Sequence, residues 1–297
     1  MTNHFLLRSI GITFLVVAMW MCSALAMEEV AMVQIPTSGE DIFVSAPINT
    51  ESAGKAGDIA EESVVRVICT DGGSGGTGFL NSSGRIITAA HVVKDCAIPK
   101  MVVLPSTSGP IAVSNVVVND DLDLALLTLA TQMTAKAFSI SKSTDVKVGS
   151  QVSTWGFPGG YAGRRPLLSV GYLSGMDARK SASGSIIKRW VVNAAFNLGN
   201  SGGPLINIED GSVVGVVSSK LAPMPPDVES AIQALKSQKS GFQYTATRPD
   251  GSTFKVSEGQ VAAMVLEHLR SQTQLVIGHA VLLDDVRSFL KEHGVKP

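Results

Sequence analysis

Short apolar runs rich in valine and isoleucine alternate with glycine, proline and Asn-Asp turn sequences through the middle of the chain. Runs of this length, bounded by turn residues, are typical of β-strands, and a long series of them predicts an all-β barrel or sandwich rather than alternating strands and helices. The expected strands cover residues 64–69, 77–81, 85–89, 101–104, 111–118, 124–128, 151–156, 168–175, 185–193, 203–207 and 212–218.

The pattern changes after residue 226. Apolar residues then recur at helical spacing in two segments, and Ser257 with Gln260 forms a capping box that predicts the start of the second one. The turn sequence Pro249-Asp250-Gly251 predicts a hairpin between the two helices. In chain order, we expect a helix over 227–239, strands over 242–248 and 253–256, a helix over 258–272, a strand over 275–283 and a terminal helix over 285–293.

The N-terminal residues carry a targeting pattern. An uncharged apolar run begins at Ile10 and ends at Ala24-Leu25-Ala26, the A-x-A pattern that signal peptidase cleaves. The alternative is an uncleaved membrane anchor, but the run is short for a hydrocarbon layer of about 30 Å. We expect a signal peptide over 1–26, a secreted or periplasmic mature chain without stable membrane association, a flexible polar leader over 27–60 and a folded domain over 61–297.

Charge excludes some partners. The chain has 24 basic and 25 acidic residues, a formal net charge of -1, and no long run of either sign. Proteins that bind nucleic acid or an anionic membrane surface carry clusters of basic residues, and this sequence has no such run. We therefore expect no nucleic-acid partner.

The cysteines form an even pair once the signal peptide is removed. Cleavage takes Cys22 away and leaves Cys69 and Cys96 in an oxidising compartment. A disulfide between them would add roughly 3 kcal/mol of stability in the chain-entropy account. The alternative is a pair of buried free thiols.

The segment Gly199-Asn200-Ser201-Gly202-Gly203-Pro204-Leu205 is the most informative part of the sequence for chemistry. A serine attacks a carbonyl only from an open, turned backbone, which glycines permit. The N–H groups of Gly199 and Ser201 could then converge on the oxyanion that the attack creates. Ser201 is therefore the candidate nucleophile and Gly199 with Ser201 the candidate oxyanion hole. Taken alone, the segment could also be an ordinary glycine-rich turn.

Two further residues fit this chemistry. His91 follows an apolar strand, and an imidazole can accept a serine proton near neutral pH. Asp123 directly precedes a run of core residues, where a carboxylate needs a hydrogen-bond donor such as a histidine N–H. We expect Asp120 and Asp121 to be solvated in the preceding turn. The order His, Asp, Ser in these contexts is more specific than any single residue.

These motifs resemble those of a known family. T-A-A-H, D-L-A-L-L and G-N-S-G-G-P-L, in this order, resemble the chymotrypsin clan, and Trp155-Gly156-Phe157-Pro158-Gly159 resembles a turn of its HtrA/Deg branch. The resemblance implies two perpendicular six-stranded Greek-key barrels, with His91 and Asp123 from the first barrel and Ser201 from the second. It also implies an endopeptidase that needs no cofactor, acts on polypeptides, contributes to protein quality control and forms homo-oligomers.

The chain departs from the family pattern in three places. Asn200 stands where digestive relatives carry an aspartate that pairs with a new N-terminus, so that activation switch is not expected. HtrA proteins usually continue into a PDZ domain, and we expect this chain to lack one. Residues 222–274 form an insertion before the last strand, expected to fold as helix-hairpin-helix. It either shapes the specificity pocket or stabilises the surface.

The resemblance places the pocket floor near Ala195 and its walls at Asn197, Leu198, Val217, Ser218 and Ser219. None of these residues is acidic, so we expect a preference for small or medium aliphatic side chains rather than Arg or Lys. His268 and His279 have no companions at metal-ligand spacing, so we expect no metal site. The alternative function is a catalytically silent peptide-binding protein on the same fold, because a fold does not imply activity.

Overall fold

The computed structural model describes residues 56–70, 75–98, 100–106, 108–142, 146–181, 183–220, 226–247, 251–272 and 277–296. The chain divides into two compact units, of which the smaller contains the described residues between 226 and 272 and the larger contains the others. The expected signal peptide and most of the expected leader lie outside the described residues.

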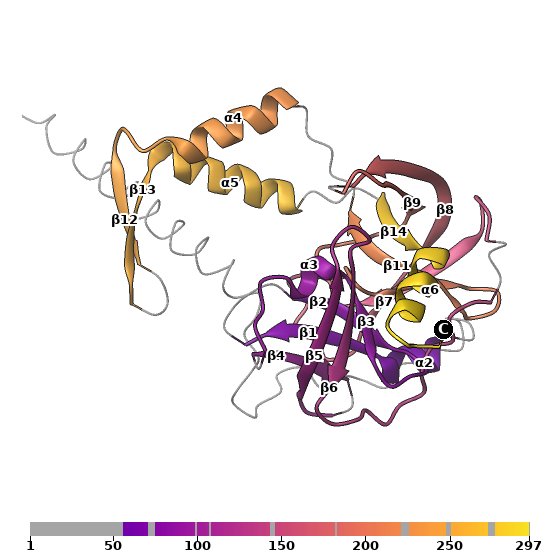
Figure 1. The fold of residues 1–297 in the computed structure, drawn as a ribbon. Helices are drawn as coiled ribbons and strands as arrows, with labels where there is room; N and C mark the ends of the chain where they lie inside the picture. The colour runs from indigo at the N-terminus through magenta and orange to yellow at the C-terminus, as the bar shows by residue number, and fades with distance from the viewer. Residues whose placement is uncertain are drawn as a thin grey trace, which may run out of the picture. The chain divides into compact units, whose positions relative to one another are not determined.

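The larger unit contains two closed barrels of six antiparallel strands each (Figure 1). The first has the order β1-β2-β3-β6-β5-β4 and consists of β1 (Val64–Cys69), β2 (Gly76–Leu80), β3 (Ile86–Thr88), β4 (Met101–Pro105), β5 (Ile111–Asn119) and β6 (Leu124–Leu129). The second has the order β10-β11-β14-β9-β8-β7 and consists of β7 (Gln151–Gly156), β8 (Leu167–Lys180), β9 (Ile186–Asn193), β10 (Pro204–Asn207), β11 (Val213–Lys220) and β14 (Gly278–Leu282). The predicted all-β, chymotrypsin-like pair of barrels is confirmed.

The Val/Ile-rich runs fill three hydrophobic clusters. One lies inside the first barrel around Val67, Leu127 and Val103, and another inside the second around Val152, Leu205 and Val217. The third contains residues of both barrels, such as Phe79 and Trp155, and so packs the barrels against each other. The candidate site therefore rests on two rigid scaffolds that share one core.

Helices complete the larger unit. The predicted terminal helix is present as α6 (Leu283–Glu292), which buries Val286, Phe289 and Leu290 in the shared cluster. Helix α2 (Gly57–Ser63) precedes β1, and its Ala60 is fully buried in the same cluster. The expected flexible leader is therefore wrong at its end, since residues 57–60 are helical. The small side chain of Ala60 lets this helix pack closely against the core. None of the helices in the described residues combines the length and hydrophobicity that a membrane span requires.

The smaller unit has the predicted helix-hairpin-helix elements: α4 (Pro226–Ser237), β12 (Gln243–Thr247), β13 (Thr253–Ser257) and α5 (Glu258–Gln272). Strands β12 and β13 pair antiparallel. The capping box is confirmed, because the Gln260 N–H donates to Ser257 Oγ at 3.2 Å and the Ser257 N–H donates to Gln260 Oε1 at 2.9 Å. The turn residues Pro249 and Asp250 lie outside the described part. An effect of the insertion on specificity stays a prediction.

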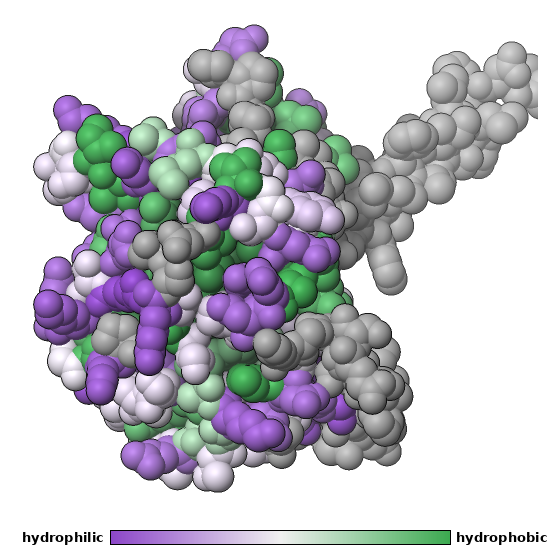
Figure 2. Space-filling model, turned by 90° about the vertical axis from the view of Figure 1, so that its right-hand side faces the viewer, coloured by the Kyte–Doolittle hydropathy of each residue, from purple (hydrophilic) through white to green (hydrophobic). Residues whose placement is uncertain are grey.

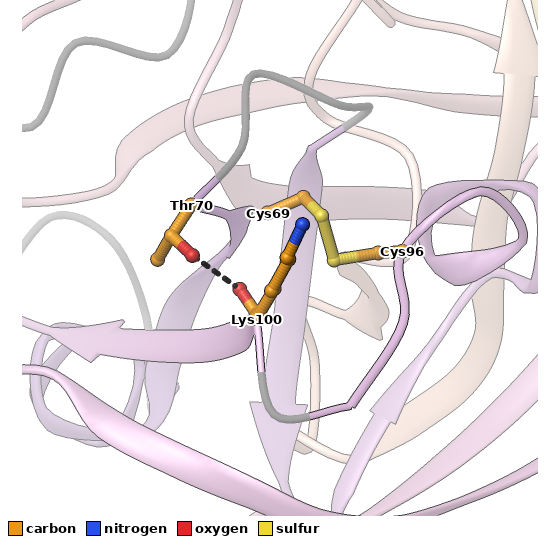
Figure 3. Close-up of a disulfide and its surroundings, with 4 residues drawn as sticks. All are labelled: Cys69, Thr70, Cys96 and Lys100. Atoms are coloured by element: carbon orange, nitrogen blue, oxygen red, sulfur yellow. Dashed lines mark hydrogen bonds between the residues drawn. A yellow bond between two sulfur atoms is a disulfide. The ribbon is translucent and has the colours of Figure 1, made fainter.

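The two cysteines are joined by a disulfide (Figure 3). Cys69 ends β1, and Cys96 follows the short helix α3 (Ala90–Val93). The strand end is further fixed because the Thr70 N–H and hydroxyl donate to the Lys100 carbonyl at 2.9 and 3.1 Å. The bridge that the sequence predicted is present, and the alternative of two free thiols is wrong for this structure. The face in Figure 2 mixes hydrophilic and hydrophobic residues.

Candidate active site

His91 and Asp123 are in contact in the first barrel of the larger unit. His91 lies on α3, and its Nδ1 is 3.0 Å from each carboxylate oxygen of Asp123. The backbone N–H of His91 also donates to Asp123 Oδ1 at 3.1 Å. The Asp123 carboxylate therefore holds both the ring and the helix that carries it. With Nδ1 donating to Asp123, Nε2 is the ring atom left to accept a proton.

The two side chains differ in their solvent exposure. The side chain of His91 is 49% exposed and that of Asp123 is 13% exposed. Burial raises the pKa of Asp123, but the hydrogen bond and charge of His91 and a hydrogen bond from Ser218 outweigh burial, so this pKa lies below its ordinary value. Asp123 is thus a carboxylate at neutral pH, held beside an imidazole that solvent and ligands can reach.

The turn around Ser201 needs its glycines. Gly199 and Gly202 have φ angles of 92° and 86°, in the left-handed region that favours glycine. A Cβ on Gly199 would come within 2.3 Å of the Phe157 carbonyl oxygen, and one on Gly202 within 2.1 Å of the Thr77 carbonyl oxygen. The glycine-rich segment is therefore more than an ordinary surface turn, because its backbone packs directly against the first barrel and the residues that follow β7.

Thr77 connects the first barrel to this turn. Its backbone N–H donates to the Ser201 carbonyl at 2.9 Å, and its hydroxyl donates to the Gly199 carbonyl at 2.6 Å. The same hydroxyl accepts a hydrogen bond from the Phe157 N–H at 3.0 Å. Thr77 is fully buried on β2. One side chain thus satisfies two backbone groups that would otherwise be buried without partners.

The two candidate oxyanion donors point away from the groups that hold the turn. The carbonyl of Leu198 accepts from the Gly159 N–H at 2.6 Å, and the carbonyl of Asn200 accepts from the Gly203 N–H at 3.0 Å. In a trans peptide the N–H points opposite to the carbonyl, so the N–H groups of Gly199 and Ser201 face the other side. Within the described part of the chain, neither of these N–H groups donates to a protein atom. Both are available to a developing oxyanion.

Ser218 links the candidate nucleophile to the candidate acid. The Ser201 hydroxyl donates to the Ser218 carbonyl at 2.9 Å, and the Ser218 hydroxyl donates to Asp123 Oδ2. Among the described residues, the Ser201 hydroxyl makes no hydrogen bond to His91 in this conformation. The sequence suggested Ser218 only as a pocket wall. Nothing local marks its second contact, because the partner lies 95 positions away in the chain.

The other predicted pocket residues differ in how far their side chains are exposed. The Ala195 carbonyl accepts from the Asn200 side-chain amide at 3.2 Å, Asn197 is half-buried and Leu198 is exposed. The Val217 side chain is buried in the second-barrel cluster, so Val217 can offer a pocket only its backbone. Ser219 pairs with His279 through the backbone, and its side chain lies outside the described residues.

Asn200 and His279 differ in their hydrogen-bond partners. Asn200 is 3% exposed, and its Oδ1 has no hydrogen-bond partner among the described residues. His279 Nε2 lies 3.0 Å from Asp177 Oδ2, which gives this histidine a partner on the neighbouring region of the second barrel. In the part of the chain that the structure describes, no group of three His, Cys, Asp or Glu side chains could hold a metal ion. The side chain of His268 lies outside that part.

Part of the chain is similar in sequence to known proteins. Residues 76–216 match the family model described as a trypsin-like peptidase domain. The serine protease Do-like HtrA of Bacillus subtilis is 34% identical over 176 residues, which cover 57% of this chain and 38% of that protein. The probable periplasmic serine endoprotease DegP-like of Chlamydia pneumoniae is 33% identical over 142 residues, which cover 48% of this chain and 28% of that protein.

The chain thus spans well under half the length of these relatives. Among solved structures, the active form of the Rv3671c protease from M. tuberculosis aligns with 79% of this chain and 93% of its own, at 22% identity and a TM-score of 0.49. The family match runs from the start of β2 into β11, and this stretch of the chain includes His91, Asp123 and the Ser201 turn. Residues 76–216 therefore match a trypsin-like peptidase domain, and the chain is similar in sequence to the HtrA and DegP-like serine proteases.

Proposed function

We propose that this chain is a secreted serine endopeptidase in which Ser201 is the nucleophile, His91 the general base and Asp123 the residue that orients His91. The contact of His91 Nδ1 with the buried Asp123 carboxylate, at 3.0 Å from both oxygens, carries the proposal. This contact favours the tautomer with an unprotonated Nε2 and stabilises the imidazolium that forms after proton transfer. A surface histidine without a catalytic role does not require a buried carboxylate beside its Nδ1.

The reaction follows from the positions of these groups. Ser201 Oγ bonds to the peptide carbonyl carbon while its proton passes to His91 Nε2, and the carbonyl electron pair moves to oxygen. The N–H groups of Gly199 and Ser201 stabilise that oxyanion, each worth about 3 kcal/mol where such donors have been removed. His91 then protonates the leaving amine as the C–N bond breaks. Water then attacks the acyl carbon while its proton passes to His91 Nε2. The bond between that carbon and Ser201 Oγ breaks, and Oγ takes the proton from His91, which releases the acid product.

One side-chain movement precedes attack. The Ser201 hydroxyl donates to the Ser218 carbonyl, so it must rotate to donate to His91 instead. Rotamer changes of partly exposed side chains take about picoseconds to nanoseconds, which is fast compared with turnover. The resting hydrogen bond at 2.9 Å therefore does not argue against the proposed role of Ser201.

Substrate and compartment complete the proposal. The A-x-A sequence and the disulfide fit an oxidising compartment, and the relative from Chlamydia pneumoniae is named a periplasmic endoprotease. We infer a polypeptide substrate with a small or medium aliphatic residue before the cleaved bond, because Ala195, Asn197 and Leu198 offer no acid to a basic side chain. A preference for unfolded chains, as in protein quality control, and a homo-oligomeric assembly belong to the same proposal.

Hydrolysis by the mature chain tests the proposal. The chain from Met27 is incubated with a peptide library and with an unfolded protein, beside the Ser201→Ala and His91→Ala variants. We expect cleavage by the wild type after small or medium aliphatic residues and none by Ser201→Ala. Peptide binding without cleavage by both the wild type and Ser201→Ala would support the silent peptide-binding alternative instead.

A further inference from the structure

Arg189 on β9 is a buried arginine that connects the two barrels. It is 3% exposed. Across the neighbouring strands of the second barrel, Arg189 pairs with Val281 of β14 and with Asp177 of β8. Its Nη2 nevertheless donates to the Leu122 carbonyl of the first barrel at 2.9 Å, with the Asp121 carbonyl at 3.4 Å. The catalytic mechanism proposed above gives Arg189 no role.

The two carbonyls belong to the turn that leads into Asp123. Asp123 has a φ of 53°, and it is the one non-glycine residue with a positive φ in the described part of the chain. A residue with a Cβ is strained in this region and remains there only when its surroundings hold it. The position of the Asp123 carboxylate therefore depends on contacts that fix the preceding turn.

The N–H side of this turn is fixed locally. The Leu122 N–H donates to Asn119 Oδ1 at 2.9 Å, and the Asp123 N–H donates to the Asp120 carbonyl at 3.3 Å. The contacts of Arg189 act on the carbonyl side, from a strand 67 positions away from Leu122 in the chain. A guanidinium suits this task because its rigid fork presents several donors at fixed angles.

Other contacts explain Arg189 less well. Its nearest carboxylate is Asp285 of α6, with Nη1 and Oδ2 3.8 Å apart. Burial is the main cause that lowers the pKa of Arg189, and the like charge of Arg179 adds to it. A single long ion pair does not offset the burial of a guanidinium, and an apolar side chain of the same volume would be less costly there. Its Nη1 also donates to the Lys188 carbonyl of its own strand at 3.1 Å, so the hydrogen bonds to the turn are the ones that join Arg189 to the first barrel.

We propose that Arg189 is a positioning residue that fixes the turn before Asp123 and so places the Asp123 carboxylate against His91 Nδ1. The inference rests on the proposed peptidase function. It means that the second barrel, which carries Ser201, also sets the position of the acid in the first barrel. A change in the packing of the two barrels would then move the nucleophile and the acid together.

Kinetics of Arg189→Met test this role. Methionine fills a similar volume without donors, and we expect kcat to fall by about 10- to 100-fold, as small misplacements of catalytic groups do, with KM within about twofold. Arg189→Lys keeps the charge and hydrogen-bond donors but lacks the planar fork, so its loss of kcat should be smaller than that of Arg189→Met. The matched control is Arg287→Met on α6, which removes an arginine contact to the Ser141 carbonyl and should leave kcat unchanged.

A spectroscopic measurement separates positioning from simple stability. The proton on His91 Nδ1 gives a far-downfield NMR signal when it is held by the carboxylate, and we expect that signal to weaken in folded Arg189→Met but not in Arg287→Met. Wild-type kcat and signal in folded Arg189→Met would overturn the inference. If Arg189→Met does not fold, Arg189→Lys decides in the same way. A wild-type chain without any hydrolysis would contradict the proposed function instead.

Discussion

Replacing Thr77 with valine removes a single hydroxyl and keeps almost the same shape. Thr77 is fully buried, so the packing around β2 should persist. The Gly199 carbonyl loses the hydrogen bond at 2.6 Å, and the Phe157 N–H loses its acceptor at 3.0 Å. The substitution therefore tests whether the first barrel holds the candidate oxyanion segment.

The structure sets the size of the effect. A buried polar group left without a partner costs about 1 to 3 kcal/mol, so an unrelaxed Thr77→Val chain should lose about 2 to 6 kcal/mol of unfolding free energy. Relaxation would reduce this loss by moving the Gly199 peptide. Removal of one oxyanion donor costs about 100- to 1,000-fold in kcat where it has been measured, and a displaced Gly199 N–H should approach that loss. Thr77→Val should thus lose stability, activity or both.

Urea denaturation and peptide hydrolysis measure the two effects. Thr88→Val is the matched control, because Thr88 is equally buried and its hydroxyl donates to the Thr77 carbonyl at 2.6 Å without touching Gly199. We expect Thr88→Val to lose about 1 to 3 kcal/mol of unfolding free energy and to keep its kcat. Wild-type stability together with wild-type kcat in Thr77→Val would refute the role assigned to Thr77.

Three further predictions follow from the same structure. Gly199→Ala should abolish hydrolysis, because an added Cβ would lie 2.3 Å from a backbone oxygen. Gly160→Ala has a similar positive φ of 80° but open space around it, so it should keep activity; equal activities would contradict this. Replacing Cys69 and Cys96 by serine should lower the unfolding free energy by about 3 to 4 kcal/mol in the chain-entropy account, and an unchanged urea midpoint would contradict it. Because the pKa of Asp123 is lowered by folding, its contribution to stability is complete above the unfolded value of about 3.9 and is lost as pH falls below it; Asp123→Asn should lose less stability between about pH 6 and pH 3, and parallel urea midpoints would contradict this.

Local patterns in the sequence predicted most of the fold. Strands over 64–69 and 151–156 and the helix over 258–272 have the expected bounds, because apolar periodicity and turn residues are local signals. Helix α2 was missed because its segment is short, polar and alanine-containing, and only its burial in the core makes it helical. Strand β8 extends to Lys180 through exposed residues that carry no apolar signal.

The candidate site divides in the same way. His91, Asp123 and Ser201 stand in motifs that can be recognised one at a time, and the geometry brings His91 and Asp123 together. Thr77 and Arg189 have no such motif. Their partners Gly199 and Leu122 are 122 and 67 positions away, so their roles depend on tertiary packing that no local pattern specifies.

Covalent labelling tests the central claim most directly. A fluorophosphonate reacts with a serine hydroxyl only when a neighbouring base and oxyanion donors activate it. The mature wild-type chain is labelled under native conditions beside folded Ser201→Ala and His91→Ala, and the adduct is located by peptide mass mapping. We expect one adduct on Ser201 of the wild type and none in either variant. Equal labelling of Ser201→Ala, or a folded wild-type chain that takes no label, would contradict the assignment of Ser201 as the nucleophile.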